Sequence, residues 1–268
     1  MDRKDRMEKL IFKKAIFQMK RSANILFILS ILLISPLITL AKDPVTIFLA
    51  GDSTCANKQA DKRPETGWGE MLQQYFDPAK VKIDNRAMNG RSTKSFIAEG
   101  RWQKIIDDMK AGDWVFVQFG HNDESKDKGE RYTPPEDFKK NLVKFITEVR
   151  AKKGIIVLMT PVMRRRFNER GEFYDTHGEY PGYTRAVAAE QKVPLIDMHR
   201  KSEAIIKRYG QEDSKKLFLI LREGENPNYP KGVDDNTHFS PIGAEEMAKA
   251  AVEGIRETRL KLRKYLRK

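Results

Sequence analysis

Short apolar runs alternate with amphipathic stretches along most of the chain. Five runs have the length and composition of buried strands, at residues 45–50, 81–86, 114–119, 155–160 and 194–198. The stretches between and after them carry apolar residues at helical spacing and predict helices at 68–76, 96–109, 135–152, 183–192 and 244–252. Strands and helices that alternate at this spacing predict an α/β fold with a five-stranded parallel sheet covered by helices on both faces.

The N-terminus departs from this alternation. Residues 23–41 form an apolar run behind two basic residues, and Ala41 closes the run before a polar segment. This order predicts a signal peptide that is cleaved near Ala41, and hence a secreted or periplasmic protein. An uncleaved membrane anchor is the alternative, because the run is long enough to cross a bilayer. Residues 1–18 are an unusual extension before a signal, so the start of translation is either Met1 or Met19.

We therefore divide the chain into an extension with a signal peptide (1–41), one α/β domain (42–255) and a basic helix end or tail (256–268). The formal net charge of +13 is concentrated at the two ends, because residues 1–41 carry +5 and residues 255–268 carry +6. The body is nearly balanced, so its charge predicts no nucleic-acid partner. The single cysteine, Cys55, cannot form an internal disulfide. We expect a monomer whose mature domain does not associate with membranes.

Polar, glycine-containing loops follow the first three predicted strands, and a basic loop follows the fourth. Their sequences are GDST (51–54), AMNGRS (87–92), GHNDES (120–125) and PVMRRR (161–166). The carboxyl ends of parallel strands share one edge of the sheet, so these loops should open together on that edge.

Acyl transfer from an ester needs a nucleophile, a base, a carboxylate that holds the base, and donors for the oxyanion. Ser53 is the candidate nucleophile, in a tight turn between a strand and a helix. Of four histidines, His238 is the candidate base, and Asp235 three residues earlier can hold its Nδ1. Asp234 competes for that role, and its alternative duty is capping or solvent contact.

The oxyanion donors would be the backbone amide of Ser53, the backbone amide of Gly90 and the side-chain amide of Asn122. A glycine amide can approach an oxyanion closely because it has no side chain. The asparagine NH₂ is a neutral donor, so it leaves the serine–histidine chemistry undisturbed.

These four blocks, in this order, resemble the SGNH hydrolases, also called the GDSL esterase family. The resemblance spans residues 45–252 and implies a three-layer α/β/α, flavodoxin-like sandwich. The segments GDSTCANK, RPETGWGEML, NRAMNGRSTKSFI, GDWVFVQFGHND and DNTHFSPIGA are similar to those of the rhamnogalacturonan acetylesterase branch. Thr54 stands where the family name has leucine, and this branch commonly shows threonine there. The resemblance implies a serine esterase that removes acetyl groups from pectic polysaccharide.

Five residues are candidate contacts for the sugar chain. Trp68 could stack on a sugar face, although it could equally pack inward. Arg91 and Arg164 could hold a galacturonate carboxylate, although Arg164 belongs to a basic run that could simply be solvated. His177 and Tyr180 lie in a long irregular segment that we expect to wall the substrate groove.

The expected partner is an acetylated plant cell-wall polysaccharide or oligosaccharide. The chemistry needs no cofactor, and the sequence has no cluster of His, Cys and carboxylates that would predict a metal site. Two alternatives remain. One is an SGNH esterase for another ester, such as acetylated xylan or a lipid. The other is a polysaccharide-binding module that performs no chemistry.

Overall fold

A computed structural model of the chain describes residues 2–32 and 43–267, and its contacts divide the chain into two units, Met1–Lys42 and Asp43–Lys268. In the first unit, α1 (Arg3–Leu32) is a single helix. The predicted cleavage position near Ala41 lies outside the described residues. Within the two described ranges, no helix is both long enough and apolar enough to cross a membrane.

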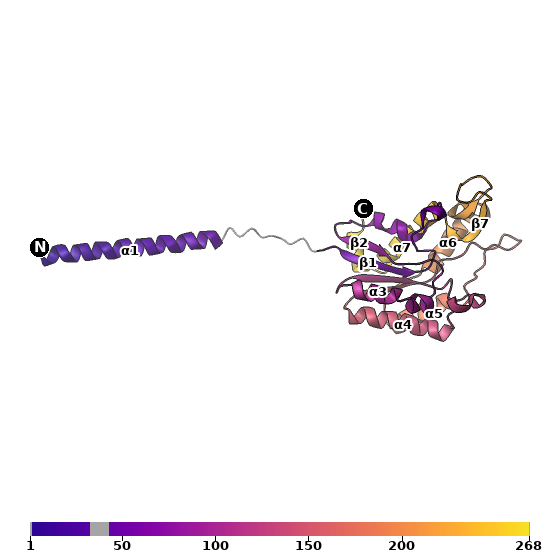
Figure 1. The fold of residues 1–268 in the computed structure, drawn as a ribbon, viewed down its shortest axis with the longest axis horizontal. Coiled ribbons are helices and arrows are strands. Elements are labelled where there is room, and N and C mark those ends of the chain that lie inside the picture. Colours follow the sequence, from indigo (N-terminus) through magenta and orange to yellow (C-terminus); the bar gives the residue numbers. More distant parts are fainter. Residues whose placement is uncertain (1, 33–42, 268) are drawn as a thin grey trace. The chain divides into compact units, whose positions relative to one another are not determined.

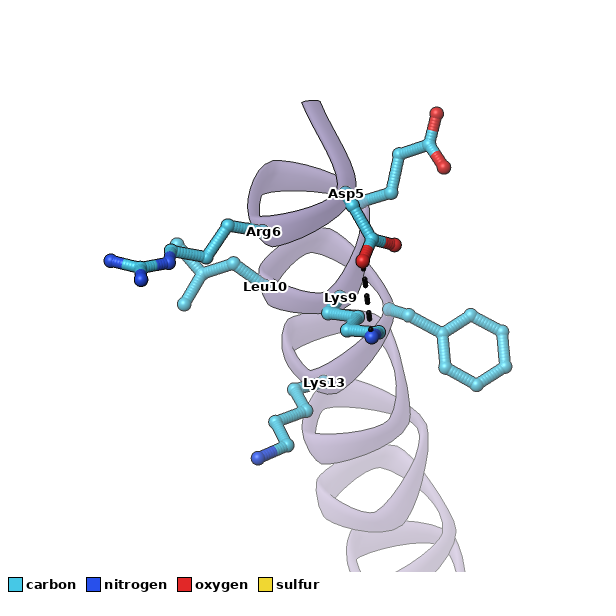
Figure 2. Close-up of a pocket in the computed structure, with 7 residues that line it drawn as sticks. Asp5, Arg6, Lys9, Leu10 and Lys13 are labelled. Atoms are coloured by element: carbon cyan, nitrogen blue, oxygen red, sulfur yellow. Dashed lines mark hydrogen bonds and ion pairs between the residues drawn. The ribbon is translucent and has the colours of Figure 1, made fainter. Parts of the chain in front are cut away.

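The side chains of α1 form a hollow that involves this helix alone. Figure 2 shows Asp5, Arg6, Lys9, Leu10 and Lys13 projecting from successive turns, with an ion pair of 3.3 Å between Lys9 and Asp5. Both partners of the pair are largely exposed, so it contributes little to stability. Among residues 2–32 and 43–267, only residues of α1 line the hollow, and we assign it no role.

The second unit is built on a five-stranded parallel sheet with the order β2-β1-β3-β4-β5. Its strands are β1 (Val45–Gly51), β2 (Val81–Asn85), β3 (Trp114–Gln118), β4 (Ile155–Met159) and β5 (Leu195–Ile196). Each coincides with one of the apolar runs, so the predicted α/β fold with a five-stranded parallel sheet is confirmed. β1 lies between β2 and β3, so the loop after it lies between the loops that follow those two strands at the carboxyl edge.

Alternate residues of each strand face two separate cores. In β1, Ile47 and Leu49 pack in one core, whereas Phe48 and Ala50 pack in the other. Helices α3 (Arg101–Asp108), α4 (Pro135–Ala151) and α5 (Tyr180–Glu190) cover one face of the sheet, as Figure 1 shows. The other face is covered by α6 (Met198–Asp213) and α7 (Pro241–Glu257). Burial on both faces explains why β1, β3 and β4 are almost wholly apolar, whereas the edge strand β2 alternates apolar residues with Lys82 and Asp84.

The helices of this unit broadly follow the predicted ranges. They are α2 (Thr93–Ala98), α3 (Arg101–Asp108), α4 (Pro135–Ala151), α5 (Tyr180–Glu190), α6 (Met198–Asp213) and α7 (Pro241–Glu257). Two short helices lie near the carboxyl edge, η1 (Ala60–Lys62) and η3 (Lys126–Arg131), and a third, η4 (Ser214–Leu217), follows α6.

Four features differ from the prediction. The single helix expected at 96–109 is divided into α2 and α3, because Gly100 adopts a left-handed φ of 67°. The helix expected at 68–76 is the 3₁₀ helix η2 (Trp68–Tyr75). The sequence reading missed α6 and an antiparallel hairpin formed by β6 (Phe218–Leu221) and β7 (Val233–Phe239).

The C-terminal segment, predicted as a helix end or tail at 256–268, packs against the domain. Helix α7 continues past the expected boundary to Glu257, and the short helix η5 (Lys261–Tyr265) follows it. Leu260 and Leu262 are buried in the same core as α7. The basic residues of this segment therefore surround an apolar anchor, and the segment is part of the α/β domain.

Candidate active site

The turn after β1 presents Ser53 at the carboxyl edge of the sheet. β1 ends at Gly51, and the fully buried Asp52 accepts hydrogen bonds at Oδ1 from the backbone N–H and the hydroxyl of Thr54, at 2.9 and 2.8 Å. The carbonyl of Asp52 also accepts from the amides of Cys55 and Ala56. These bonds fix a tight turn, so the Ser53 side chain is directed away from the core. Burial raises the pKa of Asp52, although its bonds with Thr54 oppose that effect.

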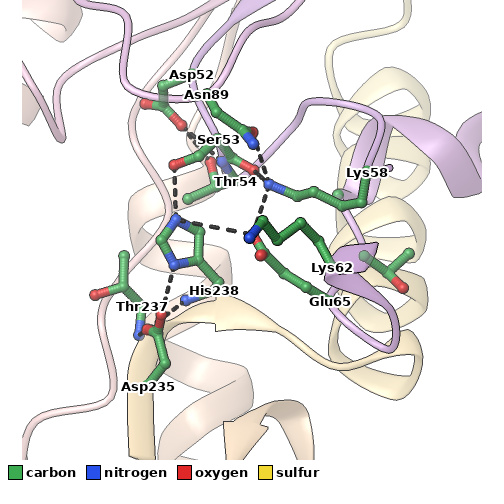
Figure 3. Close-up of polar contacts among 12 residues, drawn as sticks. Asp52, Ser53, Thr54, Lys58, Lys62, Glu65, Asn89, Asp235, Thr237 and His238 are labelled. Atoms are coloured by element: carbon green, nitrogen blue, oxygen red, sulfur yellow. Dashed lines mark hydrogen bonds and ion pairs between the residues drawn. The ribbon is translucent and has the colours of Figure 1, made fainter. Parts of the chain in front are cut away.

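His238 links the Ser53 hydroxyl to a carboxylate. Its Nε2 lies 2.8 Å from Ser53 Oγ, and its Nδ1 lies 2.7 Å from Asp235 Oδ2 (Figure 3). The other oxygen of Asp235 accepts from the backbone amides of Thr237 and His238, at 2.7 and 3.0 Å. A carboxylate at Nδ1 favours the tautomer with its proton there, which leaves Nε2 free to accept the serine proton.

An irregularity in β7 makes this pairing possible. In a regular strand, residues three apart point to opposite faces. Here Phe239 pairs with Phe218 while Asp235 pairs with Leu219, so three residues of β7 lie between positions that are adjacent on β6. This bulge turns the Asp235 and His238 side chains toward each other. The predicted pairing of Asp235 with His238 is present, but on a bulged strand rather than in a turn.

The position of Asp235 keeps it ionised. Burial alone would raise its pKa, but the hydrogen bonds and the positive charge offered by His238 outweigh burial and hold the pKa at about 2. The competitor Asp234 does not contact His238, and its Oδ1 accepts from the Asn236 side chain at 2.9 Å. The structure therefore pairs the imidazole with Asp235.

Three donors line the same hollow as the hydroxyl of Ser53. The backbone amides of Ser53 and Gly90 have no hydrogen-bond acceptor among residues 2–32 and 43–267. Asn122 donates one N–H to the Arg91 carbonyl at 3.0 Å, which orients its side chain and leaves its second N–H available. Gly90 has a φ of 75°, a conformation that disfavours any residue with a Cβ.

A second buried carboxylate joins the two loops that carry Gly90 and Asn122. Asp123 Oδ1 accepts from the backbone N–H and the hydroxyl of Thr93, at 2.9 and 2.6 Å, and thereby fixes the first turn of α2. Asp123 is fully buried and its Oδ2 has no hydrogen-bond partner within the described structure. Burial raises the pKa of Asp123 to about 7.

The catalytic residues and the three donors line a hollow of about 390 Å³. It contains all five residues predicted for catalysis and the oxyanion, namely Ser53, Gly90, Asn122, Asp235 and His238. Its remaining lining residues are largely polar or charged: Lys62, Glu65, Asn89, His121, Lys128, Arg131, Arg164 and Thr237. A nucleophile, a base and free donors around one polar space can perform acyl transfer on a hydrophilic ester.

Comparison with known proteins identifies the family. The model of the GDSL-like Lipase/Acylhydrolase family matches residues 49–245, which include every one of these five positions. The chain belongs to this family. It is 43% identical over 225 residues to the rhamnogalacturonan acetylesterase RhgT of Bacillus subtilis, a match that covers 84% of this chain and 95% of RhgT. It is also 41% identical over 217 residues to the probable rhamnogalacturonan acetylesterase YesY of the same organism, covering 81% and 94% of the two chains.

A solved structure supports the same assignment. The crystal structure of YxiM from Bacillus subtilis superposes with a TM-score of 0.69 at 27% identity, covering 81% of this chain and 58% of that one. The fold, the family match and the acetylesterase relatives together show that this GDSL-family chain is an esterase.

Trp68 of this GDSL-family esterase supports the nucleophile turn from inside the domain. It is only 1% exposed, and its indole N–H donates to Gln118 Oε1 at 2.7 Å. Gln118 in turn donates to the Thr54 hydroxyl at 3.2 Å. A Cβ on Gly67 would lie 2.1 Å from the Ala56 carbonyl oxygen, so the segment before Trp68 packs directly on the turn. The prediction that Trp68 stacks on a sugar is therefore wrong, because the ring is buried.

Three other predicted sugar contacts are also engaged within the protein. His177 is buried, with Nδ1 2.8 Å from Glu124 Oε2 and Nε2 2.8 Å from the Val162 carbonyl oxygen. The buried Tyr180 donates its hydroxyl proton to the Thr133 carbonyl at 2.6 Å. Arg91 forms an ion pair of 3.0 Å with Glu99. None of the three lines the hollow. Burial excludes His177 and Tyr180 as sugar contacts, so these two predictions are wrong. Arg91 is partly exposed, and its contact with a sugar stays a prediction.

Arg164 is the one predicted sugar contact that lines the hollow. Its guanidinium forms an ion pair of 2.6 Å with Glu124 and also donates to the His121 carbonyl at 3.3 Å. Because its charge is already paired, Arg164 shapes the wall of the hollow and has little free charge for a ligand.

The sequence reading missed a buried ion pair beside the base. Lys58 Nζ lies 2.7 Å from Glu65 Oε1, and that oxygen lies 4.0 Å from His238 Nε2 (Figure 3). Lys58 also donates to the Ser53 carbonyl and, at 2.9 Å, to Asn89 Oδ1. The ammonium thus ties the nucleophile turn to the loop of Gly90. The only sequence signal was a lysine and a glutamate flanking a polar loop, which usually indicates solvent exposure.

No cluster of three His, Cys, Asp or Glu residues in the described part of the chain has the arrangement of a metal site. Cys55 is buried, and burial raises its pKa well above the usual range, so the thiol is not activated as a nucleophile.

Proposed function

We propose that this esterase removes acetyl groups from pectic rhamnogalacturonan through an acetyl-enzyme on Ser53. The observation that carries the proposal is the 2.8 Å contact between Ser53 Oγ and His238 Nε2, at the edge of a hollow that also holds Gly90 and Asn122. A hydroxyl that is hydrogen-bonded to an oriented imidazole beside unengaged donors has the arrangement of a serine hydrolase.

In the first half of the reaction, His238 Nε2 takes the proton of Ser53 as Oγ attacks the acetyl carbonyl carbon. The imidazolium that forms is stabilised by the ionised Asp235 at Nδ1. The carbonyl oxygen becomes an oxyanion and accepts hydrogen bonds from the amides of Ser53 and Gly90 and from the side chain of Asn122. The tetrahedral intermediate then collapses, the ester C–O bond breaks, and the sugar hydroxyl leaves with the proton from His238.

In the second half, a water molecule gives its proton to His238 Nε2 and attacks the acetyl carbonyl of the acylated Ser53. The same donors hold the second oxyanion. Its collapse breaks the bond to Oγ, which recovers the proton from the imidazolium, and acetate is released. Each proton that His238 accepts is returned, so the cycle regenerates the resting site.

The substrate assignment is supported by the relatives. RhgT is a rhamnogalacturonan acetylesterase that is 43% identical to this chain, and the match covers nearly the whole of RhgT. The hollow itself is lined mainly by polar and charged residues, which suits a sugar rather than an acyl chain of a lipid.

Acetate release from a panel of acetylated polymers tests this proposal. We expect rapid release from acetylated rhamnogalacturonan, slower release from acetylated xylan, and none from either polymer with Ser53→Ala. Faster release from xylan would contradict the substrate assignment. Release by Ser53→Ala at the rate of the wild type would contradict the mechanism.

The same proposal includes export, because the predicted substrate lies outside the cell. The signal-like order of residues before Ala41 supports it. N-terminal sequencing of the protein recovered from the producing cells should find a mature chain that begins shortly after Ala41. A chain that retains residues 23–41 would indicate an uncleaved anchor instead.

A further inference from the structure

The charged residues around the catalytic hollow differ in whether each has a partner of opposite charge within the protein. Both acidic residues in its lining have a basic partner: Glu65 lies 2.7 Å from Lys58, and Asp235 lies 2.7 Å from His238. Arg164 is likewise paired with Glu124. The Glu65 carboxylate therefore has a cation of its own, and the Asp235 carboxylate is held by hydrogen bonds from His238 and from the backbone.

Three basic residues on the rim are not balanced in this way, and we call Lys62, Lys128 and Arg131 the cationic rim. Within the part of the chain that the structure describes, the side chains of Lys128 and Arg131 make no hydrogen bond or ion pair. Lys62 has only an exposed contact of 3.6 Å with Asp61. The two lysines and the arginine come from η1 and η3, on different loops, and they converge on the mouth of the hollow.

Arg131 has a defined place against the oxyanion loop. A Cβ added to Gly90 would lie 3.1 Å from Arg131 Cζ and 3.2 Å from each terminal nitrogen. All three distances are nearly equal, so the guanidinium lies flat against the glycine. Its N–H groups remain free for a ligand, and a guanidinium binds a carboxylate through two parallel hydrogen bonds.

An acetyl ester is neutral and gains little from these charges. An uncompensated group of cations favours a negative charge elsewhere on the substrate. A galacturonan offers that charge, because each galacturonate residue has a carboxylate, whereas the xylose backbone of xylan has none.

We infer that Lys128 and Arg131 bind a uronate carboxylate of the polymer, close to the acetyl group that is removed, and that Lys62 strengthens this attraction from the opposite loop. This inference deepens the proposed function and rests on it. It makes the enzyme selective for acetyl groups on an acidic polymer by a contact separate from Ser53 and His238.

The test compares acetylated rhamnogalacturonan with the same polymer after its carboxylates have been reduced to alcohols. The measured quantity is the ratio of kcat/KM on the charged polymer to that on the neutral polymer. We expect the ratio to fall about tenfold in Arg131→Gln and further in Lys128→Gln/Arg131→Gln, as the loss of hydrogen bonds to a charged group requires. Arg170→Gln, on an exposed loop away from the hollow, is the matched control and should keep the wild-type ratio.

Salt provides a second readout of the same contact. Raising the ionic strength should lower the wild-type ratio, because exposed charges are screened within about 8 Å at physiological salt. The ratio for the double variant should change much less. A ratio that is unchanged in both variants, with melting temperatures equal to that of the wild type, would overturn the inference.

This experiment distinguishes a failure of the proposed substrate from a failure of the proposed role of the cationic rim. If the wild-type enzyme releases no acetate from either form of rhamnogalacturonan, the proposed substrate is wrong. If it releases acetate equally from both forms and the variants do the same, the substrate assignment stands and the cationic rim has no role in it.

Discussion

Asp235 and His238 lie only three residues apart on β7, and their side chains meet with Oδ2 2.7 Å from Nδ1. The bulge in β7 opposite Phe218 and Leu219 brings them to the same side of the hairpin. The hairpin therefore orients the base, while the parallel sheet presents the nucleophile. The catalytic geometry depends on packing between these two parts of the domain, 185 residues apart in the chain.

Replacement of Asp235 by Asn should reduce kcat by about 10²–10⁴-fold, because an amide favours the wrong tautomer and cannot stabilise the imidazolium. Steady-state hydrolysis of a small acetyl ester measures this loss. Asp234→Asn is the matched control, since the Asp234 carboxylate accepts from Asn236 and does not hold His238, so this variant should keep most of the activity. Equal losses in the two variants would contradict the assignment of Asp235.

Removal of the Asn122 side chain should lower kcat by about 10²–10³-fold with a small change in KM. The reason is that its donor acts on the charge that develops in the transition state and not on the ground-state ester. Asn122→Ala also loses the bond to the Arg91 carbonyl. Thermal unfolding therefore accompanies the kinetics, and a loss of kcat that appears only when the variant is partly unfolded would contradict an oxyanion role.

The Lys58–Glu65 pair should be important for stability. Lys58→Met leaves the buried carboxylate of Glu65 without its cation, and we expect a loss of about 3–5 kcal/mol in the free energy of unfolding. Lys58→Met/Glu65→Leu removes both charges and should recover most of that loss. Arg170→Ala, which breaks an exposed pair with Glu172, should change the free energy by less than about 1 kcal/mol. Denaturant titration compares them, and equal effects in Lys58→Met and Arg170→Ala would contradict this account.

Asp123 should give the protein a distinctive dependence of stability on pH. Its pKa is raised to about 7 in the folded state, whereas an unfolded aspartate titrates near about 3.9. Between these values the folded state holds more protons than the unfolded state, so this group makes stability fall as pH rises, by at most about 1.4 kcal/mol per pH unit. Above pH 7 its contribution is constant.

Asp123→Asn keeps an acceptor for Thr93 and removes the titration. The free energy of unfolding of the variant, relative to that of the wild type, should therefore increase between pH 4 and pH 7 and then level off. Urea titrations at several pH values measure this difference, in which most other titrating groups cancel. A difference that does not change with pH would show that Asp123 is ionised throughout this range.

The parallel sheet could be predicted from the sequence because its inner strands β1, β3 and β4 are buried on both faces and are therefore almost wholly apolar. The hairpin of β6 and β7 could not, because β7 is VDDNTHF, a polar strand with no alternation. The polar residues of β7 form the bulge and supply the catalytic pair Asp235 and His238, and they are not buried in the core. The pairing of Asp235 with His238 was still predictable, since it depends on their short separation in the chain.

The burial of three predicted sugar contacts, Trp68, His177 and Tyr180, could not be predicted, because residue type does not reveal which partner a side chain finds. Trp68 and Tyr180 have the ring chemistry of sugar contacts, but each bonds a buried acceptor. Conversely, Arg131 lies in a loop with no recognisable motif, and its place beside Gly90 results from the path of η3. Long-range packing determines these positions, and a single sequence carries little information about it.

The central claim is that Ser53 carries the acetyl group during turnover. Rapid acid quenching during hydrolysis of an activated acetyl ester, followed by peptide mass spectrometry, tests it most directly. We predict an added acetyl group on the peptide that contains Ser53, at a level that declines when the ester is exhausted. An enzyme that turns over rapidly in the same experiment with its acetyl group on another residue would contradict the account.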